Sequence, residues 1–110
     1  MSLTFYGAPM STASITEAVL AELAIPHARV MLDISAGDTR APAFLELNPN
    51  GRVPVIVHDG TPIWESSAIT MYLGEVFGVD RGLYPGPGPR RGEAMKWIAW
   101  SNVTLAEAAG

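Results

Sequence analysis

The sequence predicts an α/β fold, a small mixed sheet of four strands with helices on both faces, and three observations lead to this prediction. Between Leu3 and Leu32 an apolar strand, a helix with regular apolar spacing and a second strand follow one another, the order of a parallel crossover unit. Asp59-Gly60 between two apolar runs is a strong signal for an antiparallel hairpin. A helical pattern after the hairpin completes the order βαβ-ββα.

The first half of the chain supplies the crossover unit. Leu3–Tyr6 is the first predicted strand. Ser14 and Glu17 have the spacing of a capping box, which predicts that the first helix opens at Ser14. Arg29–Leu32 is the second predicted strand, and Pro42–Leu47 fits one or two helical turns with proline near the first position.

The second half supplies the hairpin and a longer helix. Val53–His58 and Pro62–Trp64 are the predicted hairpin strands. Ser66 or Ser67 then opens a helix whose apolar residues recur on one face, and Gly78 is expected to end it.

A cluster of glycine and proline from Gly82 to Pro89 is the one clear linker, because neither helix nor strand tolerates such a run. We expect residues 1–80 to form one compact domain and residues 81–89 to be the linker that follows it. Arg90–Ala109 then fits a single amphipathic helix. Trp97 and Trp100 in this helix require a partner surface that buries them, which predicts a second copy or a longer parent chain.

Composition limits the function classes. Hydrophobic residues make up 48% and charged residues 16%, which is typical of a folded domain. The net charge of −4 and the scattered lysines and arginines argue against nucleic-acid binding. No apolar run is long enough for a membrane span, and the N-terminus lacks the pattern of a signal peptide, so a cytoplasmic location is expected. With no cysteine and two unpaired histidines, His27 and His58, we expect no metal site, and any thiol must come from a ligand.

The loop after the first strand places Ser11 between a strand end and a helix start, where backbone N–H groups and the helix dipole favour an anion. Two interpretations remain open from these residues alone. Ser11 or Ser14 caps the helix, or Ser11 donates a hydrogen bond to a thiolate. Tyr6 is better interpreted as a packed aromatic residue than as an activating hydroxyl.

Two further segments could bind a peptide-like ligand. Pro54 cannot donate to a sheet, so the main chain of Val53 before it is available for pairing with an extended peptide. From the dipeptide alone a trans bond is favoured. Glu65 and Ser66 precede the last helix and match the ammonium and carboxylate of an amino-acid head group, although a helix cap explains them equally well.

The order and spacing of these segments are more specific than any one of them. Gly7-Ala8-Pro9-Met10-Ser11, the run from Pro42 to Pro54, and Glu65-Ser66-Ser67-Ala68-Ile69 closely resemble the N-terminal domain of the glutathione transferases. The resemblance covers nearly the whole chain and is closest to the serine-type branch, in particular the phi and related bacterial classes. It implies a thioredoxin-like fold for residues 1–80. It also implies that residues 90–110 are the first helix of a truncated all-helical second domain.

The resemblance implies a glutathione site at Ser11, Arg40, Arg52, Val53, Pro54, Glu65 and Ser66. In the family the serine hydrogen-bonds the glutathione sulfur, and the residue before a cis proline pairs its main chain with the cysteinyl part. The Glu-Ser pair holds the γ-glutamyl amine and carboxylate. Arg40 falls where phi enzymes have a lysine near the glycyl carboxylate. Thr39 and Arg52 depart from the phi pattern, which has His and Gln there.

The implied function is glutathione transfer in detoxification: the bound thiol is ionised and attacks an electrophile. The electrophile pocket belongs to the second domain in this family, so the sequence does not choose the substrate. Alternatives are a non-catalytic binding module and a glutathione-dependent disulfide or peroxide reductase. The resemblance also implies a homodimer, in which the helices at 68–77 and after 91 meet their symmetry mates.

Overall fold

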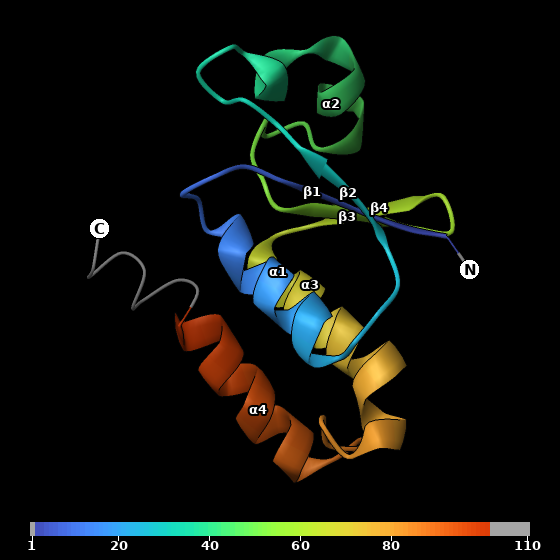
Figure 1. Cartoon of the computed structure of the whole chain (residues 1–110). Helices are drawn as coiled ribbons and strands as arrows, with labels where there is room; N and C mark the ends of the chain where they lie inside the picture. The colour runs from blue at the N-terminus through green and yellow to red at the C-terminus, as the bar shows by residue number, and fades with distance from the viewer. Residues whose placement is uncertain (1, 102–110) are drawn as a thin grey trace.

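A computed structural model describes residues 2–101, which form a four-stranded sheet in the order β2-β1-β3-β4 (Figure 1). The strands are β1 Leu3–Gly7, β2 Ala28–Met31, β3 Val55–His58 and β4 Thr61–Trp64. β1 pairs with β2 in parallel and with β3 antiparallel, and β3 pairs antiparallel with β4. The predicted mixed sheet is therefore confirmed, including the hairpin at Asp59-Gly60.

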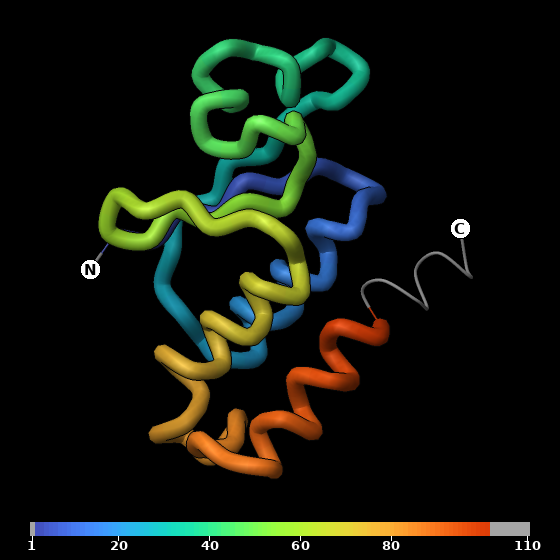
Figure 2. Tube along the Cα trace, turned by 180° about the vertical axis from the view of Figure 1, so that it is seen from behind, coloured from blue at the N-terminus to red at the C-terminus, as the bar shows by residue number. Residues whose placement is uncertain are grey.

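The helices lie on both sides of this sheet, as predicted. α1 Ala13–Glu22 and α3 Ser66–Leu73 run side by side against one face, and α4 Pro89–Trp100 lies outside them (Figures 1 and 2). The short α2 Pro42–Leu47 lies beyond the other face. The residues between α2 and β3 therefore reach the sheet from the side opposite α1 and α3.

The core fills the space between the sheet and the α1/α3 layer. Alternate residues of β1 are buried, as a strand with one face on the core requires. The buried cluster consists of Leu3, Phe5, Ala13, Leu20, Leu23, Ile25, Ile56, Ile69 and Leu73. This core holds the start of α1 and the start of α3 at the same end of the strands. The candidate site lies at this end.

The other sheet face is covered more thinly. Tyr6 of β1 points to this side, and its ring contacts the buried Phe44 of α2 at 6.1 Å between ring centroids. The edge-to-face arrangement is typical of packed aromatic pairs. Tyr6 thus holds α2 against the sheet, as expected for a packing residue.

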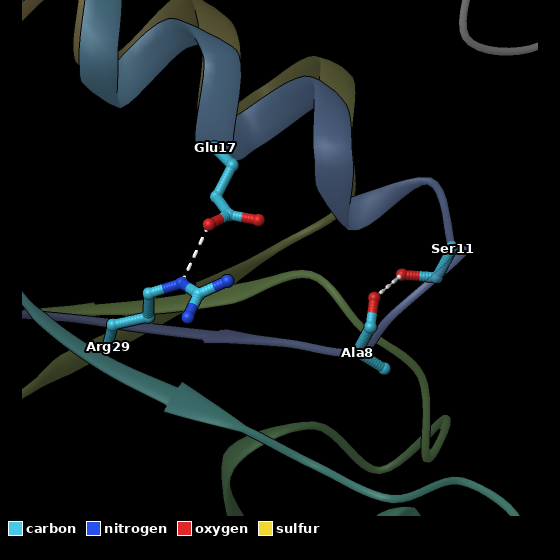
Figure 3. Close-up of polar contacts among 4 residues, drawn as sticks. All are labelled: Ala8, Ser11, Glu17 and Arg29. Carbon is cyan, nitrogen blue, oxygen red and sulfur yellow. Dashed lines mark hydrogen bonds and ion pairs between the residues drawn. The ribbon is translucent and has the colours of Figure 1, made fainter.

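The start of α1 differs from the sequence prediction. The helix begins at Ala13, one residue before Ser14, and Thr12 is its N-cap without a side-chain cap bond. Glu17 does not reach back to the helix start, because its carboxylate accepts a hydrogen bond from Arg29 at 2.7 Å (Figure 3). The capping box at Ser14 and Glu17 was therefore a wrong prediction.

The helix after the hairpin also ends earlier than predicted. α3 stops at Leu73, and a π-helical turn, Gly74–Gly78, and a 3₁₀ turn, Val79–Arg81, follow it. A Cβ on Gly74 would lie 2.6 Å from the ring of Tyr84, so the missing side chain lets the linker pack here. The linker is thus anchored to the end of α3.

The last described helix carries the exposed tryptophans. α4 ends at Trp100, and the predicted continuation through Leu105 to Ala109 lies outside the described residues. Within residues 2–101 Trp97 is 58% exposed and Trp100 44% exposed. No helix in this range combines the length and the apolar character that a bilayer crossing requires.

Candidate functional site

One cleft brings together most of the residues that the sequence singles out. We call it the site cleft, a hollow of about 500 Å³ within the range of small-molecule sites. Its lining comes from the start of α1, the segment between α2 and β3, and the junction of β4 with α3. The lining residues are Thr12, Asn48, Asn50, Arg52, Val53, Pro54, Trp64, Glu65 and Ser66.

The segment between α2 and β3 is held in place by Asn48, which is 2% exposed. Its side-chain amide donates to the carbonyl of Arg52 at 2.9 Å. Its side-chain oxygen accepts from the backbone N–H and the side chain of Asn50, both at 3.0 Å. One buried amide therefore fixes the turn that presents Arg52 to the cleft.

The next residues form the cleft floor. The Val53–Pro54 peptide bond is cis, as the family resemblance implied and the dipeptide alone did not. Strand pairing in β3 begins only at Val55. Within residues 2–101 the main chain of Val53 makes no hydrogen bond to the protein. Its polar groups are therefore available to a ligand, as predicted.

The junction of β4 and α3 combines strain with burial. Glu65 has φ +80° and ψ 114°, a conformation that costs a non-glycine residue about 1–3 kcal/mol. Ser66, the first residue of α3, is 5% exposed. Its position puts the positive end of the α3 dipole at the cleft, where it favours a carboxylate. Strain of this kind is concentrated at ligand sites.

Ser11 lies beside the site cleft, and its hydroxyl is engaged locally. The hydroxyl donates to the carbonyl of Ala8 at 2.7 Å (Figure 3) and accepts from the N–H of Ala13 at 3.2 Å. The second bond gives the first N–H of α1 an acceptor, although the N-cap residue is Thr12 and makes no side-chain cap bond. A hydrogen bond from Ser11 to a thiolate requires its proton to turn away from Ala8.

Ser11 is not a lining residue of the cleft, but the adjacent Thr12 is. Ser14 lies within α1 with its side chain exposed, and Tyr6 packs on α2. At the start of α1 the hydroxyl residue that lines the cleft is therefore Thr12, and Ser11 is its neighbour in the chain.

Arg40 stands behind the cleft rather than in it. A Cβ on Gly51 would lie 3.0 Å from Arg40 Nη1 and 3.0 Å from the carbonyl oxygen of Thr39. Gly51 has φ +64°, so it is needed both for the turn and for the close approach of Arg40. The two arginines, Arg40 and Arg52, thus flank the same glycine on the α2 side of the cleft.

The two other hollows of more than 600 Å³ in the described part of the chain contain none of the predicted site residues. A hollow of about 660 Å³ is formed by the consecutive residues 82–90 of the linker, so it brings no distant groups together. A third, of about 610 Å³, lies between the loop after β1 and residues 31–38. Within residues 2–101 the His, Asp and Glu side chains form no group of three that could hold a metal ion.

Four lining residues were missed by sequence reasoning: Thr12, Asn48, Asn50 and Trp64. The sequence indicated only a turn at Asn48 and Asn50. In the structure this turn forms a wall of the cleft. Trp64 was interpreted only as the end of a strand. The alternation of β4 could have placed Trp64 on the α2 side, opposite the core-facing Ile63.

Comparison with known proteins gives one family. The model of the glutathione S-transferase N-terminal domain matches residues 1–75. The glutathione S-transferase GstB of Escherichia coli is 38% identical over 91 residues, which cover 81% of this chain and 43% of that protein.

Solved structures agree with this match. The glutathione transferase URE2P6 from Phanerochaete chrysosporium, in complex with oxidised glutathione, has a TM-score of 0.86 and 28% identity over 93% of this chain. Ure2p in complex with glutathione has a TM-score of 0.88 and 26% identity over 96% of this chain. The matched parts are 49% and 51% of those chains, so this chain spans about half the length of its relatives.

Proposed function

This chain belongs to the glutathione S-transferase family through its N-terminal domain, and on that premise we propose that it binds glutathione in the site cleft. The observation that carries the proposal is the convergence of Arg52, Val53, Glu65 and Ser66 from separate segments onto one hollow. A cation, a carboxylate, a helix N-terminus and an unpaired main-chain segment are the groups that a charged tripeptide requires.

Each part of glutathione has a counterpart in the cleft. The main chain of Val53 pairs with the cysteinyl residue in the manner of an added strand. Glu65 holds the α-ammonium of the γ-glutamyl head group, while Ser66 and the start of α3 hold its carboxylate. Arg52, supported by Arg40, attracts the glycyl carboxylate. Pro54 shapes the floor by keeping Val53 out of the β3 ladder.

The proposed chemistry is stabilisation of the thiolate for attack on an electrophile. A free thiol with a pKa near 8.5 is only about 3% ionised at pH 7. Lowering its pKa by about two units makes the thiolate the major form, which corresponds to about 2.7 kcal/mol. Ser11 and the N-terminus of α1 supply a hydroxyl donor and a helix dipole beside the cysteinyl position.

We assign the electrophile pocket to the second half of the relatives' length, which this chain does not span. We propose that residues 1–80 are the glutathione domain, 81–89 the linker and 90–110 the start of a helical domain that completes the electrophile pocket. The exposed Trp97 and Trp100 support a further covering surface for α4. A homodimer through the α3 and α4 side is the assembly we propose.

A reductase function is the second candidate, because URE2P6 was solved with oxidised glutathione. This chain contains no cysteine. In its cleft the thiolate of the bound glutathione would therefore attack the substrate disulfide and release one substrate thiolate. A second glutathione would then attack the glutathione sulfur of the mixed disulfide, which releases the other substrate thiolate and forms oxidised glutathione.

Isothermal titration calorimetry tests the proposal with three ligands: glutathione, γ-glutamylcysteine and cysteinylglycine. We expect glutathione to bind most tightly and both truncated peptides to bind at least tenfold more weakly, because each lacks one terminal residue and cannot place a charge at that end of the cleft. Glu65→Gln should weaken the binding of glutathione and leave the binding of cysteinylglycine unchanged. Glu46→Gln, an exposed carboxylate on α2 outside the cleft, is the matched control. Equal affinity for all three ligands would show that the cleft does not recognise glutathione.

A further inference from the structure

Trp64 is a large aromatic residue of the site cleft to which the proposed function gives no role. It ends β4 and pairs with Val55 of β3, which is fully buried. The Trp64 side chain is 38% exposed and lines the cleft together with Glu65 and Ser66. Its position therefore puts an indole ring at the end of the cleft where the head group would lie.

Within residues 2–101 the Trp64 ring makes no cation–π or ring–ring contact. In the described part of the chain two cations lie over aromatic rings, Arg91 over Tyr84 and Lys96 over Trp97. The ring pairs found in this part do not include Trp64 either. Because Trp64 is 38% exposed and lines the cleft, a ligand cation can still supply such a contact.

The residue after Trp64 adds a negative charge. Glu65 is exposed, lines the same cleft, and adopts the strained backbone described above. A partly exposed indole ring beside a carboxylate is a chemical match for an ammonium group, because the ring quadrupole and the carboxylate both attract a cation. A carboxylate or an uncharged group gains nothing from this electrostatic attraction.

We propose that Trp64 is a specificity-determining residue that binds the free α-ammonium of the γ-glutamyl head group by a cation–π contact. This inference rests on the proposed function, since it requires glutathione in the site cleft. Trp64 then selects tripeptides with a free amino group over those in which the amino group is removed or acylated. An apolar wall that only covers the methylene groups of the ligand is the competing role for the ring.

Paired ligands separate the two roles. Glutathione is compared with its deaminated analogue, glutaryl-cysteinyl-glycine, by calorimetry against the wild-type chain, Trp64→Leu and Trp64→Phe. Trp100→Leu is the matched control, because Trp100 is 44% exposed, lies on α4 and does not line the cleft. Circular dichroism and thermal unfolding verify that each variant is folded.

We expect Trp64→Leu to weaken glutathione about fivefold, which corresponds to about 1 kcal/mol for a partly exposed cation–π contact. The deaminated analogue should change by less than about twofold, since it offers no cation to the ring. Trp64→Phe should weaken glutathione by only about twofold, and Trp100→Leu should change neither ligand. If Trp64→Leu does not fold, Trp64→Phe with both ligands carries the same comparison.

An equal loss of affinity for both ligands in Trp64→Leu or Trp64→Phe would identify an apolar wall and overturn the inference. Unchanged glutathione affinity in Trp64→Leu would overturn it as well. These outcomes leave glutathione binding intact in the wild-type chain. Absence of binding to the wild-type chain would instead refute the proposed function, and the inference with it.

Discussion

Replacement of Ser11 by alanine tests how the chain ionises a bound thiol. In the structure the Ser11 hydroxyl donates to the Ala8 carbonyl and accepts from the Ala13 N–H. If Ser11 serves the glutathione sulfur, the proton now directed at Ala8 turns to the thiolate. The variant loses this donor but keeps the α1 dipole, so the pKa of the bound thiol should rise only in part toward its free value.

The expected rise in the pKa of the bound thiol follows from the strengths of two hydrogen bonds. Ser11 gains the bond to the thiolate and gives up the bond to Ala8. A bond to a charged group contributes about 1.5–3 kcal/mol, and the bond to Ala8 that is given up contributes about 0.5–1.5 kcal/mol. The difference is about 1–1.5 kcal/mol, which corresponds to roughly one pKa unit. Loss of the acceptor for the Ala13 N–H should also lower the free energy of unfolding by about 1 kcal/mol.

The assay is ultraviolet titration of the thiolate absorbance of glutathione bound to each variant, with calorimetry to establish saturation. Ser11→Ala should raise the pKa of the bound thiol by about one unit and change the affinity by a few-fold at most. Ser14→Ala is the control, since its exposed side chain lies on α1 outside the cleft. Thr12→Val removes the hydroxyl that does line the cleft.

An unchanged pKa in Ser11→Ala would refute this assignment. If Thr12→Val raised the pKa instead, the donor would be Thr12 and the Ser11 hydroxyl would be a helix cap only. If the pKa of the bound thiol rose in neither variant, its ionisation would depend on the α1 dipole and on main-chain groups.

Three further perturbations have expected outcomes. Gly74→Ala should destabilise the chain by about 1–3 kcal/mol in urea unfolding, because its Cβ would meet the Tyr84 ring at 2.6 Å; Gly92→Ala in α4 meets nothing within 4 Å and should be neutral or stabilising. The pKa of Asp33 is lowered below 3.8, first by a hydrogen bond from the Ser35 hydroxyl. Its contribution to stability is therefore present above about pH 4 and lost as the pH falls through the lowered pKa, so thermal unfolding of Asp33→Asn should show a smaller loss at low pH than wild type. Sedimentation should show association of the chain at micromolar concentration, and serine at both exposed tryptophans of α4 should abolish it; a monomer unaffected by that change would contradict the proposed dimer.

Local signals in the sequence predicted the fold well. Asp59-Gly60 determines its hairpin through backbone conformations that few residues tolerate, and both residues have positive φ. The strand ends at the hairpin were therefore correct to within two residues. The α1 start was predicted less well, because Ser14 has the spacing of a cap while Ser11 makes the capping contact.

Contacts between distant segments explain what the sequence could not predict. α3 was expected to run to Gly78, but Tyr84 packs on Gly74 and the helix changes to a π turn there. Trp64 was missed as a cleft residue because its neighbours in the cleft come from the segment around Asn48. The glutathione residues were named from family motifs, and the cis bond at Pro54 was favoured only on that ground.

The position of α3 connects the two ends of the molecule. Its first residue, Ser66, lies in the site cleft, and the π turn that continues it holds the linker through Tyr84. Eight residues at 1.5 Å per residue make a rigid rod of about 12 Å between these points. Both contacts therefore depend on one helix, whose Ile69 and Leu73 are fully buried in the core.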